Sequence, residues 1–386
     1  MSQIDFDALL RLLSFTPGEP MLFNSGLFLV LFLLFSAGYA LLSAQRAKAV
    51  RLLYVTAFSY YFYYKNAGAW CCLLAVITLV NYFCALRLDH TERPAARKAW
   101  LWLAVGFMLG QLAVFKYTDF AIGTWCDLTG TPRPETPALP VLVGISFFTF
   151  QSMSYIIDVY RRQMPATRSL TDFAFFVSFF PTLLAGPILR ARTFLPQLQK
   201  PLCVTQQMLG TGTWFIIIGL FKKCVISDYI SVNFVSRIFD NPALYSGLEN
   251  LLGIYGYALQ LYCDFSGYSD MAIGIALWMG FEIPANFRAP YKSDSITDFW
   301  RRWHISLSSW LRDYLYISLG GNRKGRLRMY FNLFLTMLLG GLWHGASWNF
   351  VIWGSVHGFA LGVHKRFREL LGHDRHYQSR GIRRFF

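Results

Sequence analysis

The feature that most limits the fold of this chain is a series of long apolar segments without charged side chains. The clearest covers residues 21–42, which contain no Asp, Glu, Lys or Arg. About 20 apolar residues cross the roughly 30 Å of hydrocarbon in a bilayer as a helix. The segment is also too long, and begins too late, for a cleaved signal peptide. It is therefore predicted to be a membrane helix.

Further apolar segments follow along the chain, some shorter than a full span or interrupted by Gly and Pro, as in residues 178–189. They cover residues 52–64, 70–86, 100–115, 139–157, 173–189, 208–221, 251–277, 329–343 and 350–363. Irregular backbone at membrane depth must be buried in protein or line a wet cavity. We therefore expect an all-α, polytopic membrane protein, with about ten transmembrane and re-entrant helices around an internal space. No linker divides residues 1–386, which indicates a single membrane domain.

The charges are unevenly distributed and predict the orientation of the chain. The formal net charge is +15, and residues 284–328 hold nine Lys and Arg against three Asp. Excess Lys and Arg near membrane ends marks the cytoplasmic side, so this stretch is predicted to be cytoplasmic. The acidic residues Asp5, Asp7 and Glu19 favour a periplasmic N-terminus. Without a separate basic domain, nucleic-acid binding is a poor interpretation of the charge.

The seven Cys and seven His form no pattern typical of a metal site. There is no C-x-x-C pair, no companion His at zinc spacing and no H-x-x-x-H cluster. The cysteines lie mostly in apolar segments and are predicted to be small buried side chains without disulfides. We therefore expect no metal.

Residues 295–317 differ from the other segments because large aromatic side chains alternate with charged ones. The apolar side chains recur at i, i+3 and i+4, which predicts an amphipathic helix at the membrane boundary. Ser295 with Asp298 three residues later is a weaker version of the capping box.

Two carboxylates, Asp264 and Asp270, interrupt an otherwise apolar run. Charges inside a membrane segment are costly and suggest function. Each could instead cap a broken helix or pair with a nearby Arg. We favour this scaffold role over direct catalysis.

Two histidines are candidates for chemistry. His304 follows Arg301 and Arg302 on the amphipathic segment, where an interfacial histidine beside lipid-anchoring arginines is the simpler interpretation. His344 follows an apolar run, and the small residues around it at 340–346 leave room for a second backbone or a substrate. A neutral histidine suits proton transfer with a hydroxyl, but His344 alone could also be a packing residue.

Several motifs, taken together and in order, resemble the membrane-bound O-acyltransferase family. The branch is the bacterial alginate O-acetyltransferase type, which also includes the D-alanyl transfer protein of teichoic acid synthesis. The motifs are GISFFTFQSMSYIIDVYR (144–161), FFPTLLAGPILR (179–190), IIGLFKKCVISD (217–228), DFSGYSDMAIG (264–274), NFRAPY (286–291), DFWRRWHISLSSWLRDYLYISLGGNRKG (298–325) and GGLWHGASW (340–348).

This resemblance implies a ring of helices around a central substrate tunnel, with His344 as the catalytic histidine and His304 as the second one. The aspartates Asp264 and Asp270 would be structural or line the tunnel. The expected substrate-binding residues are Arg301, Arg302, Trp303, Trp343, Asn286 and Tyr291.

The implied reaction is transfer of an acetyl group from a cytoplasmic thioester, acetyl-CoA, with no bound cofactor. The acceptor is a hydroxyl of an exported polysaccharide or of a periplasmic relay protein, and the location is the bacterial inner membrane with its lipid. The alternatives are D-alanyl transfer to teichoic acid, or acetylation of peptidoglycan or cellulose. A proton-coupled transporter is a less favoured alternative of another class. Family members continue with further helices after the W-H-G motif, so this sequence is either a short member or a product truncated after Phe386.

Overall fold

The structure is a computed structural model that describes residues 6–44, 48–134, 139–140 and 142–371. Within these residues the chain is helical and contains no strand, as expected from the apolar segments. Contacts divide it into two compact units, residues 1–286 and 287–386, which are described separately. The basic tail at 372–386 and the N-terminal Asp5 lie outside the described residues. The expectation of a single domain stays a prediction.

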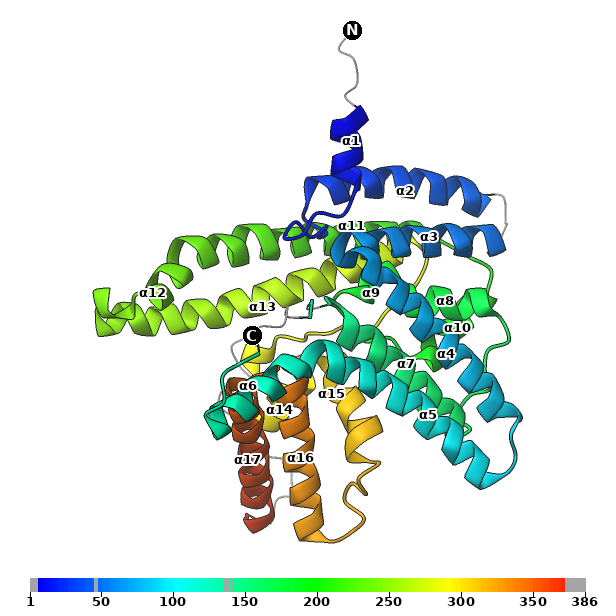
Figure 1. The fold of residues 1–386 in the computed structure, drawn as a ribbon. Coiled ribbons are helices and arrows are strands. Elements are labelled where there is room, and N and C mark those ends of the chain that lie inside the picture. The colour runs from blue at the N-terminus through cyan, green and yellow to red at the C-terminus, as the bar shows by residue number, and fades with distance from the viewer. Residues whose placement is uncertain (1–5, 45–47, 135–138, 141, 372–386) are drawn as a thin grey trace. The chain divides into compact units, whose positions relative to one another are not determined.

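The first unit contains thirteen α-helices within its described residues. They are α1 (Phe6–Leu13), α2 (Gly26–Ala44), α3 (Lys48–Ala67), α4 (Cys71–His90), α5 (Pro94–Leu112), α6 (Thr118–Thr129), α7 (Ile145–Tyr160), α8 (Leu170–Ser178), α9 (Phe180–Leu183), α10 (Ala191–Gln199), α11 (Gln206–Leu220), α12 (Ser236–Asp240) and α13 (Gly247–Trp278) (Figure 1).

Three described helical stretches are long and apolar enough to cross a membrane: Gly26–Ser43, Lys48–His90 and Pro94–Thr129. The second joins α3 to α4, and the third joins α5 to α6 through a π-helical turn, η2 (Ala113–Tyr117). They agree with the apolar segments of the N-terminal third. The ring of about ten helices stays a prediction.

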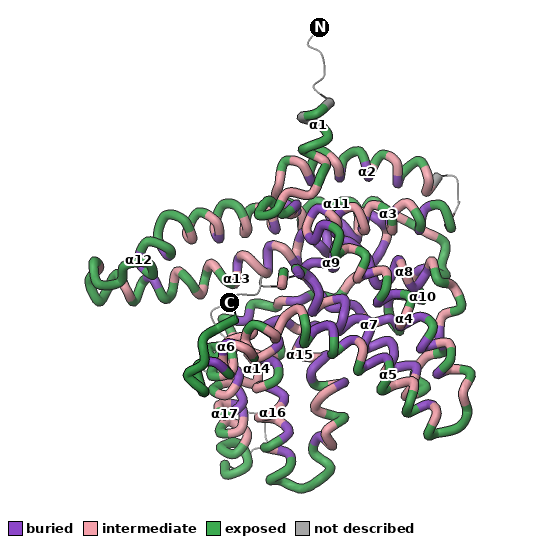
Figure 2. The backbone as a smooth tube through the Cα atoms, in the orientation of Figure 1, coloured by how far each residue is buried: buried purple, intermediate pink, exposed green. Residues whose placement is uncertain are grey.

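The core of the first unit is formed by α7, α8 and α9, which are almost wholly buried (Figure 2). Phe180, at the start of α9, is fully buried, and its ring lies 5.4 Å from that of Phe35 and 5.0 Å from that of Phe58. The chain breaks between α8 and α9 and becomes irregular after Leu183. Most of residues 178–189 are nevertheless buried, which confirms the expectation that this Gly- and Pro-containing backbone lies inside protein.

Helices α11 and α13 lie side by side and form an arm with α12 at its tip (Figure 1). Beyond α11 the arm continues as a π-helix, η3 (Phe221–Asp228). Many large apolar side chains of the arm are exposed, including Trp214 at 62% and Ile254 at 59%. In a membrane protein such surfaces suit contact with lipid.

The two aspartates of the arm lie within α13, which is one continuous helix of 32 residues. The hypothesis that they cap a broken helix is therefore wrong. Asp270 Oδ2 lies 2.6 Å from Lys222 Nζ, and Asp264 Oδ1 lies 2.6 Å from Lys223 Nζ. The partners are lysines of η3, and not the arginines that we expected. These ion pairs join two elements of the arm, which supports a scaffold role.

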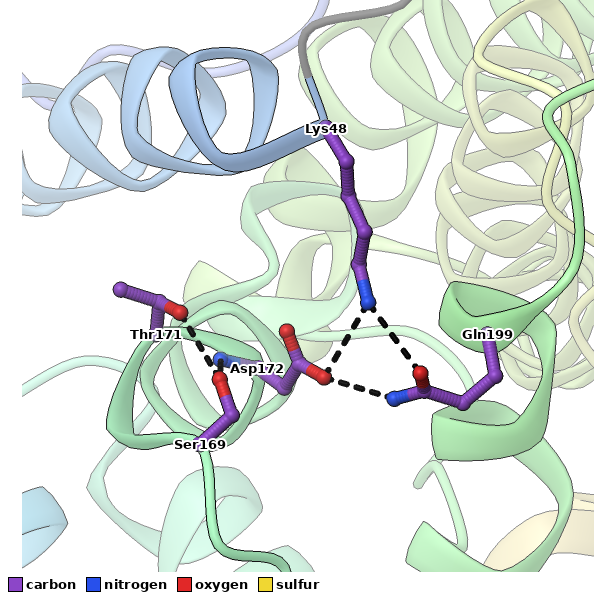
Figure 3. Close-up of polar contacts among 5 residues, drawn as sticks. All are labelled: Lys48, Ser169, Thr171, Asp172 and Gln199. Atoms are coloured by element: carbon purple, nitrogen blue, oxygen red, sulfur yellow. Dashed lines mark hydrogen bonds and ion pairs between the residues drawn. The ribbon is translucent and has the colours of Figure 1, made fainter.

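A polar cluster joins three elements of the first unit near the start of α3 (Figure 3). Lys48 Nζ lies 3.4 Å from Asp172 Oδ2 and donates a hydrogen bond to Gln199 Oε1 at 3.3 Å. Gln199 Nε2 also donates to Asp172 Oδ2 at 2.8 Å. The Ser169 hydroxyl accepts from the Asp172 backbone N–H at 3.1 Å and caps α8. The Asp172 residue is only 4% exposed, so its charge depends on these partners.

We expect Lys48→Met to lower the free energy of unfolding by about 1–3 kcal/mol, because it leaves a buried carboxylate without its cation. Adding Asp172→Asn should recover part of that loss, since a neutral amide needs no cation. Thermal unfolding of the detergent-solubilised single and double variants measures both effects. Strictly additive losses would contradict the coupling.

The second unit is built around a pair of antiparallel helices, α16 (Arg326–His344) and α17 (Trp348–Leu370). They are preceded by η6 (Pro290–Lys292), α14 (Ile296–Arg302), α15 (Ile305–Trp310) and η7 (Leu311–Tyr316).

The single amphipathic helix expected over residues 295–317 is wrong, because the chain breaks at Trp303 and His304. His304 adopts a left-handed backbone conformation with φ of 41°, which ends α14 and turns the chain into α15. The Ser295 cap is confirmed, since its hydroxyl accepts from the Asp298 backbone N–H at 3.2 Å.

Candidate active site

His344 is the last residue of α16, where two glycines bring α16 and α17 together. A Cβ on Gly341 would contact the Phe350 carbonyl oxygen and lie 2.8 Å from the Cα of Gly354. A Cβ on Gly345 would collide with the Phe350 ring. The expected close approach at residues 340–346 is therefore confirmed, and it is made by the backbone and a side chain of α17.

His304 lies next to His344, and their ring centroids are 6.2 Å apart. Its ring also lies 5.9 Å from that of Trp343. His304 is 1% exposed, and burial lowers the pKa of its imidazole well below the usual range, with the neighbouring His344 adding to the effect. His304 is therefore neutral near pH 7 and can exchange a proton from a nitrogen.

A cavity of about 990 Å³ opens beside this pair and is formed entirely by described residues of the second unit. Helices α14, α15, α16 and α17 and the turn η7 all contribute to its wall. His344 and Gly340 lie at one end of α16, and Arg326 lies at the other end. At 1.5 Å per residue Arg326 and His344 are about 27 Å apart along the helix axis. The cavity wall thus extends from the candidate histidine to the opposite end of the helix pair.

The wall of the cavity is strongly basic. It includes five Lys and Arg residues against a single acid, Glu369. The basic residues are Arg301, Arg312, Arg326, Lys365 and Arg368. Three of them, Arg326, Lys365 and Arg368, lie at the first turn of α16 and the last turns of α17, and we call them the basic rim. Such a cluster favours an anionic ligand.

The two neighbouring arginines of α14 have different surroundings. Arg301 is exposed and lines the cavity. Arg302 Nε donates to Asp298 Oδ2 at 2.6 Å, one turn earlier on the same helix. The geometry therefore places Arg301 where a ligand can reach it and gives Arg302 a partner within α14.

The aromatic residues expected to bind substrate are mostly packed against other rings. Trp303 is 8% exposed, and its ring lies 5.1 Å from that of Phe287 and 6.1 Å from that of Tyr291. Tyr291 is 53% exposed, whereas Trp343 is buried beside the histidines. A binding role for them stays a prediction.

Asn286 and the two aspartates belong to the first unit, whereas the residues that form the cavity wall all belong to the second. Asn286 is 1% exposed, and its Nδ2 donates to the Ser269 hydroxyl at 3.3 Å. This bond ties the end of the first unit to α13.

Four residues of the second unit were not singled out from the sequence. Trp300, Trp353 and His364 line the cavity, and His357 contacts two of them. The Trp353 ring lies 5.1 Å from that of His344. For three of them, the signal that could have identified them is the spacing on α17, where Trp353, His357 and His364 fall on one helical face.

Comparison of the sequence with known protein families identifies the family of this chain. The sequence profile of the membrane-bound O-acyltransferase family matches residues 57–379, which is most of the chain. This chain belongs to that family. The family membership makes it an O-acyltransferase and confirms the resemblance carried by the ordered motifs.

The membrane-bound O-acyltransferases similar to this chain differ in their named acceptors. A probable alginate O-acetylase of Pseudomonas putida is 46% identical over 353 residues, covering 89% of this chain and 71% of the relative. A peptidoglycan O-acetyltransferase of Helicobacter pylori is 38% identical, covering 90% of this chain and 71% of the relative. A teichoic acid D-alanyltransferase of Bacillus subtilis is 34% identical, covering 62% of this chain and 63% of the relative. The chain spans 66% of the alginate relative of Pseudomonas aeruginosa.

Proposed function

We propose that this chain transfers an acetyl group from acetyl-CoA to a hydroxyl of an exported polysaccharide, directly or through a periplasmic relay protein, with His344 as general base. The observation that carries the proposal is the position of His344 in the wall of a basic cavity, with neutral His304 beside it. The family membership supplies the reaction class.

In the proposed reaction His344 carries the proton, and His304 assists it. A nitrogen of His344 removes the proton of the acceptor hydroxyl as its oxygen attacks the thioester carbonyl carbon. The carbon–sulfur bond then breaks, and the departing thiolate receives the proton from His344. An ester and a free thiol result, without any net change in protons. His304, which is buried and neutral, orients the substrate or shares the proton transfer.

The basic rim supports a donor that carries phosphate groups. A ligand that binds its anionic part at the rim needs a long, thin arm to reach toward His344, because the rim and His344 lie toward opposite ends of α16. Coenzyme A combines phosphates with a long, thin arm that ends in a thiol. A short thioester without phosphates would leave the rim unused.

We expect Arg326→Ala to raise the KM for acetyl-CoA about tenfold, because it removes a charge-assisted contact of roughly 1.5 kcal/mol, and to leave kcat almost unchanged. Arg328→Ala is the matched control, since Arg328 lies two residues later on α16 and its guanidinium lies 5.3 Å from the Phe331 ring centroid. Both variants lose one positive charge from the same turn. Equal changes in KM would show that overall charge, and not the rim, attracts the donor.

The acceptor is proposed from the names of the relatives, and alginate is favoured because the alginate relatives at 45–46% identity cover about nine tenths of this chain. Mass spectrometry of surface polysaccharide from a deletion strain tests the acceptor. Loss of acetyl groups from the polysaccharide that returns on complementation is the expected result. Loss of acetyl groups from peptidoglycan would instead favour the second acceptor, which the Helicobacter pylori relative names. Loss of D-alanine esters from teichoic acid would instead favour D-alanyl transfer, and acetyl-CoA would then not be the donor.

A further inference from the structure

Two histidines of α17 contact α14 at successive levels. The Thr297 hydroxyl lies 2.8 Å from His364 Nδ1, so one donates a hydrogen bond to the other. The Trp300 ring lies 5.2 Å from the His357 ring, with an angle of 84° between their planes. His357 and His364 are seven residues apart, and Thr297 and Trp300 are three apart, so each pair shares one helical face.

The order of these contacts shows that α14 runs antiparallel to this part of α17. Trp300 also contacts Trp353, one turn before His357, with ring centroids 5.6 Å apart. The Trp353 ring in turn lies 5.1 Å from that of His344. Side-chain contacts therefore lead from Trp300 through Trp353 to His344 in the candidate active site.

The position of α14 determines where His304 lies, because His304 follows this helix after a single residue. His304 has a left-handed backbone, which costs about 1–3 kcal/mol for a residue other than glycine and needs support from its surroundings. Helix α14 has only seven residues and is too short to be stable alone. Its contacts with α17 supply a support that its own sequence cannot.

We propose that His357 and His364 are positioning residues that hold α14 against α17, so that His304 is kept beside His344 during acyl transfer. We call the two contacts, Thr297 with His364 and Trp300 with His357, the α14 clamp. The inference rests on the proposed function for its effect on turnover. Neither histidine exchanges a proton with the substrate in this role.

The first test separates the hydrogen bond from packing. Thr297→Val keeps the shape of the side chain without its hydroxyl, and Thr297→Ser keeps the hydroxyl. On the histidine side, His364→Ala removes the partner, and His364→Asn keeps a hydrogen-bonding group near the position of Nδ1. We expect Thr297→Val and His364→Ala each to lower kcat about tenfold with KM changed less than twofold, and the Ser and Asn variants to recover most of the activity.

The double variant decides whether the two residues act together. Thr297→Val with His364→Ala should lower kcat no more than either change alone, because both remove the same bond. Three results would overturn the clamp. They are a loss of kcat in the double variant that equals the product of the two single losses, an unchanged kcat in Thr297→Val, and a change confined to KM. For the second contact, His357→Ala should lower kcat about tenfold, and His357→Phe should keep most of the activity because it retains a ring against Trp300.

Hydrogen exchange gives a readout that does not depend on catalysis. In the full chain in detergent, Thr297→Val and His364→Ala should speed amide exchange in residues 296–302 about tenfold and leave α3 unchanged. Unchanged exchange in α14 would overturn the clamp even if activity fell. If the wild-type protein transferred no acetyl group, the proposed function would be wrong. Amide exchange in α14 would still test the clamp.

Discussion

Replacing His344 with alanine is expected to lower acetyl transfer by about 10²–10⁴-fold while leaving the amount of protein in the membrane near normal. The reason is its position at the end of α16, in the wall of the cavity and beside a second, neutral histidine. The measurement is acetyl transfer by membranes that contain equal amounts of each protein.

His344→Gln is the stricter variant, because glutamine keeps a hydrogen-bonding side chain of similar size but cannot exchange a proton near neutral pH. A general base should lose as much activity in the glutamine variant as in the alanine variant. A packing histidine would tolerate glutamine much better. Near-normal acetylation by His344→Gln would therefore remove the proposed catalytic role, and equal loss of folded protein in both variants would indicate a structural role.

The long apolar segments could be predicted from the sequence because hydrophobic runs determine them locally. The segment expected at residues 251–277 lies within α13, Gly247–Trp278, and the segment expected at 329–343 lies within α16, Arg326–His344. The small residues around His344 also indicated correctly that a backbone approaches there. In each case the information lies in neighbouring residues.

The break at His304 could not be predicted, because the apolar spacing continues through it and no Gly or Pro marks it. The left-handed backbone of His304 is unfavourable locally and persists through contacts with residues distant in sequence, such as Trp343. The partners of the aspartates were missed for a similar reason. Lys222 lies 48 positions before Asp270, and the sequence gives no sign that α13 returns alongside η3.

The same return of the chain creates the contact whose disruption should affect the fold most. Two glycines of α11 face two glycines of α13, and both pairs are seven residues apart along their helices. A Cβ on Gly219 would lie 2.6 Å from the Gly267 carbonyl oxygen, and a Cβ on Gly267 would lie 2.7 Å from the Gly219 oxygen. Gly212 and Gly274 have the same relation, at 2.8 and 2.5 Å. Backbone therefore meets backbone at both levels, as at close helix crossings in membranes.

Gly267→Ala is expected to lower the free energy of unfolding by about 1–3 kcal/mol, because a backbone oxygen cannot move aside as the end of a flexible side chain can. Gly267→Leu should prevent the arm from packing and remove most folded protein from the membrane, since total stability is only about 5–15 kcal/mol. Thermal unfolding in detergent and membrane abundance measure the two effects.

Gly210→Ala is the matched control, because Gly210 lies on α11 near Gly212 but a Cβ there would meet nothing within 4 Å. Alanine at this position should be neutral or should stabilise the helix by up to about 1 kcal/mol, through its higher helix propensity. The changes in unfolding free energy for Gly267→Ala and Gly210→Ala are thus expected to differ in sign or size, which separates the effect of packing from that of helix propensity. If Gly267→Ala proved as stable as Gly210→Ala, α11 and α13 would not be in the contact that brings Lys222 and Lys223 to their aspartates. The scaffold role of Asp264 and Asp270 would then lose its structural basis as well.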